Sequence, residues 1–157
     1  MKRISITLIM MITVMFSSCS SDSDSSAFES NILIDSVPFI PKTIVATPGS
    51  ASSAEKAIVF ILKKNINTGA NFDEIVFRIN YPNTQANASG TYIMNGIQGT
   101  GTYDVTPETY GLYNGSVVVE DLGNNSFNLT FQNIKGSHFI SHEIITISGT
   151  LQGKFSE

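Results

Sequence analysis

The sequence predicts an all-β domain, either an antiparallel β-sandwich or a small β-barrel of about eight or nine strands. Short runs of β-branched and aromatic residues follow one another along the chain, separated by Gly, Asn, Pro and Ser. Several runs alternate apolar and polar residues, and past residue 30 no segment shows the 3.6-residue apolar spacing of an amphipathic helix. Alternation is alike in a sandwich and in a barrel, so the sequence leaves that choice open.

The first element, residues 1–18, is predicted to be a cleaved signal peptide. Lys2 and Arg3 precede an uncharged apolar stretch, residues 4–16. That stretch is shorter than the roughly 20 apolar residues a membrane-spanning helix needs, whereas it fits the apolar core of a secretory signal.

Ser17 and Ser18 stand before Cys19, the only cysteine of the chain. This ending resembles a bacterial lipobox, although Phe16 occupies a position where leucine is commonest. The resemblance implies cleavage before Cys19 and acylation, typically palmitoylation, at that residue. Each buried acyl CH₂ contributes about 0.8 kcal/mol, so two or three chains would hold the protein firmly on a membrane.

The next element is a tether. Residues 20–26 contain only Ser and Asp, and such a segment cannot bury enough apolar surface to offset its ordering entropy. We therefore expect the lipidated cysteine and a disordered tether over residues 19–27, and a single all-β domain over residues 28–157. Asp22 and Asp24 resemble the acidic export signals of some Bacteroidetes surface lipoproteins; a plain soluble spacer is the alternative.

The first strands are predicted from a turn and two prolines. Asp35-Ser36 lies between two apolar runs and indicates a tight hairpin. Pro38 and Pro41 place its second arm at a sheet edge, because proline donates no backbone hydrogen bond to a ladder. Residues 57–62 are continuously apolar, which predicts a strand covered on both faces.

The middle of the chain predicts three further strands. Residues 74–81 alternate, which places Ile75, Phe77 and Ile79 on one face. Shorter strands are expected over residues 90–94 and, after a glycine-rich turn, over residues 102–105.

The C-terminal third shows the clearest pattern. Residues 122–125 read Leu-Gly-Asn-Asn, and Gly and Asn tolerate the positive φ that tight hairpin turns require. Residues 127–132 alternate strictly, and residues 145–155 form the last strand. Gly149 and Gly153 fall on its inward face, which predicts a bulge or bend.

Two longer stretches carry a resemblance to a known group of proteins. They are residues 115–131, Gly-Ser-Val-Val-Val-Glu-Asp-Leu-Gly-Asn-Asn-Ser-Phe-Asn-Leu-Thr-Phe, and residues 147–155, Ile-Ser-Gly-Thr-Leu-Gln-Gly-Lys-Phe. Together with the lipobox, the tether and the early hairpin, they resemble small Bacteroidetes lipoproteins with a β-sandwich or lipocalin-like domain of unknown function. The resemblance implies a fold and a location in the outer membrane, and it transfers no functional residue.

Charge and cysteine content exclude several classes of partner. Removal of Lys2 and Arg3 with the signal lowers the basic residues from 9 to 7 against 13 acidic residues, a net charge of −6. An acidic chain without a basic cluster is a poor binder of nucleic acid or of anionic lipid surfaces. A single cysteine allows no intramolecular disulfide.

Four tyrosines of the glycine-rich middle are the candidate ligand contacts: Tyr92, Tyr103, Tyr110 and Tyr113. Aromatic faces on glycine-supported loops can stack on sugar rings. The alternative is structural, because half-buried tyrosines also close the open ends of sandwiches.

Other polar residues give weaker signals. His138 and His142 have the spacing of a helical zinc pair, but no helix is expected there, so we expect loop imidazoles, no metal and no cofactor. A carboxylate pair for glycoside hydrolysis would have to come from five dispersed acids, namely Glu74, Asp104, Glu108, Glu120 and Asp121. The sequence 35–37, Asp-Ser-Val, matches the pattern that Bacteroidetes O-glycosylate in exported proteins, which makes Ser36 a candidate for modification.

The sequence therefore predicts an outer-membrane lipoprotein of the cell envelope, on the surface or the periplasmic face. Its β-domain is expected to be non-catalytic and to bind a glycan, a small apolar ligand or an envelope protein. The alternatives are a structural envelope component without a small ligand, or a hydrolase that uses the dispersed carboxylates.

Overall fold

The computed structural model describes residues 28–65 and 71–157. Within these residues the chain forms twelve strands and no helix, which confirms the all-β prediction. The strands are β1 (Phe28–Ser30), β2 (Leu33–Ile34), β3 (Val37–Pro38), β4 (Thr43–Gly49), β5 (Glu55–Lys63), β6 (Asp73–Pro82), β7 (Gly90–Ile93), β8 (Gly99–Val105), β9 (Glu108–Tyr113), β10 (Ser116–Gly123), β11 (Ser126–His138) and β12 (Ile144–Lys154).

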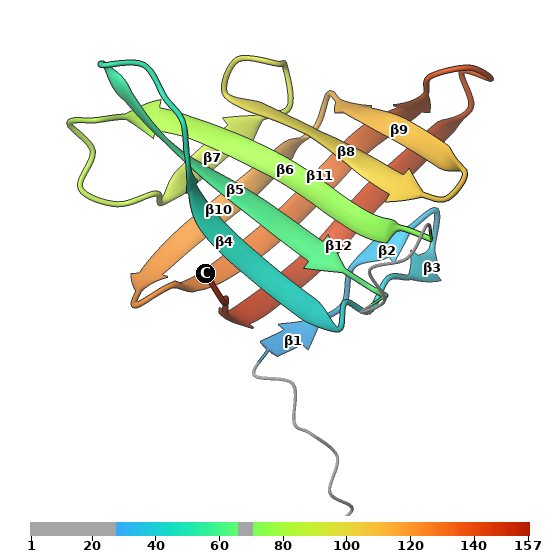
Figure 1. The fold of residues 1–157 in the computed structure, drawn as a ribbon, viewed down its shortest axis with the longest axis horizontal. Coiled ribbons are helices and arrows are strands. Elements are labelled where there is room, and N and C mark those ends of the chain that lie inside the picture. Colours follow the sequence, from blue (N-terminus) through green and yellow to red (C-terminus); the bar gives the residue numbers. More distant parts are fainter. Residues whose placement is uncertain (1–27, 66–70) are drawn as a thin grey trace, which may run out of the picture.

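One curled antiparallel sheet builds the domain. Nine strands follow one another in the order β3-β2-β12-β11-β9-β8-β6-β5-β4, and β1, β7 and β10 pair outside this path. In Figure 1 the strands β4, β5, β6 and β8 run in front and cross β10, β11 and β12 behind them. The sheet is thus a half-barrel whose two flanks face each other across the core.

A bend in β11 joins the two flanks. The first part of β11 pairs with β10, and its last residues, Lys135 to His138, pair with β9. The register against β12 shifts between Phe131 and Ile134, and Asn133 in that interval has a φ of 51°. Such a bulge increases the local twist, so one strand can belong to both flanks.

Aromatic side chains fill the space between the flanks. Phe60 stacks on Phe77 at a centroid distance of 4.8 Å and meets Phe127 edge-on at 5.1 Å and Phe155 at 5.5 Å. Phe77 in turn meets Phe131 at 5.6 Å. The centre of the half-barrel is therefore a packed core.

The β2–β3 hairpin matches the prediction from Asp35-Ser36. Both residues have positive φ, 48° and 70°, as a type I′ hairpin turn requires. β3 is the terminal strand of the sheet path, which confirms that Pro38 lies at an edge. This hairpin borders one open end of the half-barrel, at the right of Figure 1.

The opposite terminal strand, β4, has part of its free edge covered by a residue that follows β12. The Ser156 backbone N–H donates to the Ile44 carbonyl at 3.0 Å, and the Ala46 N–H donates to the Ser156 carbonyl at 2.9 Å. Further along the same edge, Pro48 presents no N–H. Both features protect an edge from pairing with another chain.

The sequence predictions need correction in four places. Residues 43–49 and 108–113 form β4 and β9, which the pattern did not indicate. The strand over residues 57–62 is not covered on both faces as predicted, because Val59 and Ile61 on its convex face stay partly exposed. At Gly149 φ is 114°, opposite the bulge of β11, as predicted; Gly153 pairs regularly with Phe127.

The part of the chain that the structure describes contains no helix with the length and hydrophobicity needed to span a bilayer.

Candidate ligand-binding site

The structure brings together two of the four candidate tyrosines. Tyr103 on β8 and Tyr110 on β9 are directly opposite each other in register, and both face the concave side of the sheet. Tyr92 is buried on β7, where its hydroxyl donates to the Ala88 carbonyl at 2.8 Å, so it is structural. Tyr113 is exposed and lies on the other face of β9 from Tyr110.

All four tyrosines lie on strands. Strands were expected at Tyr92 and Tyr103, whereas Tyr110 and Tyr113 lie on β9 and not on a glycine-supported loop as expected. The interpretation failed because Gly111 interrupts the apolar pattern of β9. A Cβ at residue 111 would lie 2.9 Å from the ring of Phe139, an exposed side chain that can move aside.

Tyr103 and Tyr110 form a fixed pair. Their rings stack with a centroid distance of 6.0 Å and an interplanar angle of 27°. The Tyr103 hydroxyl donates to Asp73 Oδ1 at 3.2 Å, and the Tyr110 hydroxyl donates to Glu108 Oε2 at 2.9 Å. Because both hydroxyls have carboxylate partners, the rings are held in one orientation.

The same environment keeps both phenols protonated. Burial, followed by the charge and hydrogen bond of Asp73, raises the pKa of Tyr103. Burial, followed by the hydrogen bond and charge of Glu108, raises the pKa of Tyr110 to about 12. At neutral pH the pair thus presents uncharged aromatic rings.

The two rings line a hollow of about 300 Å³ at the open end of the half-barrel, which we call the tyrosine pocket. Its walls come from the β2–β3 hairpin, from Val105 of β8 and from Ile145 at the start of β12. Phe39 meets Tyr103 edge-on at 6.1 Å and completes an aromatic lining. Three charged residues, Asp35, Lys64 and Glu143, also line the hollow. Mouths of β-barrels with mostly apolar walls and a few polar groups are common ligand sites.

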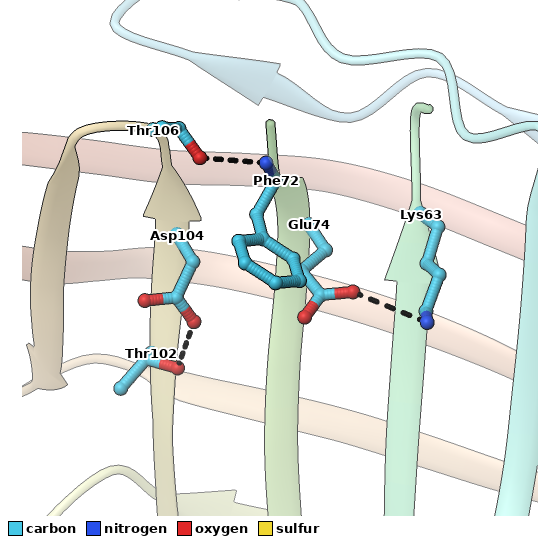
Figure 2. Close-up of polar contacts among 6 residues, drawn as sticks. All are labelled: Lys63, Phe72, Glu74, Thr102, Asp104 and Thr106. Carbon is cyan, nitrogen blue, oxygen red and sulfur yellow. Dashed lines mark hydrogen bonds and ion pairs between the residues drawn. The ribbon is translucent and has the colours of Figure 1, made fainter. Parts of the chain in front are cut away.

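A second hollow, of about 420 Å³, is lined by three of the five candidate acids. Glu74 of β6 and Asp104 of β8 are direct cross-strand neighbours, and Glu108 lines the same hollow. Figure 2 shows Glu74 and Asp104 on the same face of adjacent strands, each with a partner. Glu74 lies 3.5 Å from Lys63 Nζ, and Asp104 accepts a 2.7 Å hydrogen bond from the Thr102 hydroxyl.

The other two acids are engaged elsewhere. Glu120 accepts a hydrogen bond from the Asn128 side chain at 2.7 Å. Asp121 accepts hydrogen bonds from the backbone N–H groups of Ala88 and Gly123, both at 3.0 Å. Asp121 therefore holds the segment before β7 against the end of β10, which is a structural role.

The two histidines are not placed as a metal pair. His138 ends β11 and is half-buried, with its ring 5.2 Å from that of Tyr110 and its Nδ1 accepting from the Ser141 N–H at 2.9 Å. His142 is exposed in the following turn. The described residues contain no group of three or more His, Cys, Asp or Glu side chains suited to a metal ion.

Sequence reasoning missed a third hollow, of about 490 Å³, between the end of β4 and the C-terminal residues. Small side chains, Ala46, Ala51 and Ala57, leave this space beside Tyr81. It contains none of the predicted site residues, and its lining joins β4 and β5 to Tyr81, Asn125 and Glu157, which are far apart in the sequence.

Comparisons of the chain with protein-family models, with curated proteins and with solved structures return no match. The resemblance to Bacteroidetes lipoproteins stays a prediction. Cys19 and the tether of residues 19–27 lie outside the described residues. Ser36 is exposed in the β2–β3 turn, a position open to a modifying enzyme.

Proposed function

We propose that this protein is a non-catalytic binding module that binds a small ligand in the tyrosine pocket. The observation that carries the proposal is the stacked pair Tyr103–Tyr110, whose rings are held by carboxylates at the mouth of the half-barrel. A preformed aromatic surface loses little conformational freedom on binding, which favours affinity. A volume of about 300 Å³ suits a ligand of one small ring or one branched head group.

The proposal is tested by amide chemical-shift mapping with three soluble probes: benzyl alcohol, methyl glucoside and choline. Binding in the pocket predicts shifts at residues of the β2–β3 hairpin, β8 and the start of β12. The variant Tyr103→Leu should abolish these shifts because it removes one ring and keeps an apolar side chain. The matched control Tyr113→Leu removes a ring on the opposite face and should leave them unchanged. Shifts confined to other regions, or none with any probe, would contradict the proposal.

We further propose that the domain is held at the outer membrane through acylated Cys19. The support is the lipobox-like ending of the apolar N-terminal stretch and the presence of a single cysteine. Membrane fractionation with a Cys19→Ala control tests the anchor, and a variant that stays membrane-bound would contradict it. Protease accessibility on intact and lysed cells then distinguishes the surface from the periplasmic face.

Modification of Ser36 is a separate proposal, supported by the Asp-Ser-Val pattern and by exposure in the turn. Intact-mass measurement of the exported protein should show an added glycan that the Ser36→Ala variant lacks. If the wild type and the Ser36→Ala variant carried the same added mass, or none, the proposal for Ser36 would be contradicted.

A hydrolase is the second candidate function, favoured by the facing acids Glu74 and Asp104 in one hollow. Two carboxylates are the minimum for glycoside hydrolysis, one as acid and one as nucleophile or base. Turnover of aryl glycosides that is lost in both Glu74→Gln and Asp104→Asn would favour this function. Turnover that persists in both variants would not depend on these two acids and would contradict the hydrolase function.

The third alternative is a structural envelope component. Crosslinking followed by co-purification of one stoichiometric protein, together with no binding of the small probes, would favour that role over the binding module.

A further inference from the structure

Charge around the tyrosine pocket is unevenly balanced. Two acidic residues line the pocket. Asp35 lies in the β2–β3 turn, and Glu143 directly precedes β12. Lys64 is the basic residue of the lining, but its ammonium lies 3.3 Å from Asp73, a carboxylate outside the lining. Among the described residues the ion pairs are Lys63–Glu74 and Lys64–Asp73, so Asp35 and Glu143 have no cation of their own.

Hydrogen bonds restrict the carboxylate of Asp35 more than the carboxylate of Glu143. One oxygen of Asp35 accepts the Thr146 N–H at 2.8 Å, which fixes this carboxylate at the turn. The Glu143 side chain is exposed, and its backbone rather than its carboxylate contacts His138 and Ser141. The negative charges of both acids act on Tyr110, and both help to raise the pKa of its phenol.

The aromatic lining adds to this negative character. Tyr103, Tyr110 and Phe39 line one hollow, and the face of an aromatic ring attracts cations through its quadrupole. Ring faces combined with unpaired carboxylates favour a positive ligand over a neutral sugar, which needs hydrogen-bond donors as well as acceptors.

We infer that the tyrosine pocket binds a small organic cation, an ammonium group carried on a short apolar body. The inference rests on the proposed function, because it names the class of ligand for the same pocket. The ammonium lies against the tyrosine rings between Asp35 and Glu143, and the apolar body contacts Ile34, Val37 and Ile145, all of which line the pocket.

The test compares choline with 3,3-dimethylbutan-1-ol, the neutral molecule in which carbon replaces the ammonium nitrogen. Shape and hydroxyl are matched, so the difference in affinity reports the charge. The chain has 5 tyrosines and no tryptophan, and two of the five line the pocket, so the change in tyrosine fluorescence is compared with that of the Tyr103→Leu variant. Choline should bind at least about 10-fold more tightly than the alcohol, and the ratio should shrink at high salt.

Glu143→Gln is the diagnostic variant, because it removes one charge from an exposed side chain and leaves the shape of the pocket. It should weaken choline binding several-fold and leave binding of the alcohol unchanged. The control Glu120→Gln removes a charge from β10, outside the pocket lining, and should change neither affinity.

Equal binding of the two molecules would overturn the cation inference and leave the proposed function standing. Failure of choline, the alcohol, benzyl alcohol and methyl glucoside alike would overturn both. Choline binding that Glu143→Gln does not weaken would also overturn the inference, since the site would then lie elsewhere.

Discussion

At the scale of the residue, the tyrosine hydroxyls are the main determinants of the proposed site. Each donates to one carboxylate, Tyr103 to Asp73 and Tyr110 to Glu108, and these bonds set the direction of the rings. Glu108 is exposed while Tyr110 is 4% exposed, so the bond joins a hydrated acceptor to a buried phenol. The pocket is therefore sensitive to the protonation of its tyrosines.

Stability should fall between pH 10 and about 12 through Tyr110. The unfolded phenol ionises near 10.0, whereas burial and Glu108 raise the pKa of folded Tyr110 to about 12. In that window the unfolded state releases its proton first, so the free energy of unfolding decreases as pH rises; below pH 10 the contribution is complete. Urea unfolding at a series of alkaline pH values should give a shallower decline for Tyr110→Phe than for the wild type. Identical slopes would show that Tyr110 does not titrate in this way.

Gly149→Ala should destabilise the domain by about 3 kcal/mol or more. The φ of 114° is unfavourable for any residue with a Cβ, and that Cβ would collide with the Asn31 carbonyl oxygen. Gly123→Ala is the control, because its φ is 78° and nothing lies within 4 Å of the added atom. It should cost about 1 kcal/mol in chemical unfolding. Equal effects of the two substitutions would mean that the contact with Asn31 relaxes freely.

At this scale the sequence indicated which residues were candidates for the site, but it could not show which of them lie next to each other in the fold. Tyr103 and Tyr110 were among the predicted ligand contacts. Their stacking depends on the register of β8 against β9, and the sequence pattern did not indicate β9. Glu74 and Asp104 likewise became neighbours only through the register of β6 and β8. Asp35 and Glu143 lie at the same pocket because β2 pairs with β12. No local sequence pattern indicates that pairing.

At the scale of the element, turns were the most predictable features. The turns at residues 35–36 and 123–125 contain Asp, Ser, Gly and Asn with positive φ, as their chemistry indicates. β4 escaped prediction because Pro48 and Gly49 end it, and these residues are typical of loops. In the structure they suit a terminal strand whose outer edge makes few backbone hydrogen bonds.

Asp121→Ala should destabilise the domain by about 1–3 kcal/mol. The substitution leaves the buried N–H of Ala88 without its acceptor, and an unsatisfied buried donor carries that penalty. Thermal or urea unfolding measures the effect, with Glu120→Ala as the neighbouring control. Glu120 is exposed and accepts one hydrogen bond, from the Asn128 side chain, so its removal should change stability by about 0.5 kcal/mol or less. A loss no larger than the control's would refute the anchoring role.

At the scale of the whole molecule, the choice between sandwich and barrel lay beyond the sequence. Alternation along a strand shows which residues share a face and says nothing of how far the sheet curls. The curl depends on the bulge at Asn133, which lets β11 pair with β10 and then with β9. The aromatic core could be anticipated as a set of inward residues, but its contacts span both flanks.

Phe60→Ala should cost about 3–5 kcal/mol, because Phe60 is 0% exposed and contacts rings from both flanks. Phe139→Ala removes an equally large side chain that is 64% exposed, so it should cost about 0.5 kcal/mol. Calorimetric unfolding of both variants makes the comparison. Similar losses would indicate that the two flanks do not share one core.

The position of β12 also constrains the order of events as the chain folds. β12 pairs with β1 and β2, so that Phe28 meets Gly153 and Leu33 meets Ser148. Pairings of such high contact order form slowly, and stopped-flow refolding should give time constants of about milliseconds to seconds. The half-barrel cannot be completed before its last strand is synthesised, because a nascent chain without β12 lacks the partner of β1 and β2. For a chain exported to the outer membrane, as we propose, such a delay would favour the unfolded state that translocation requires.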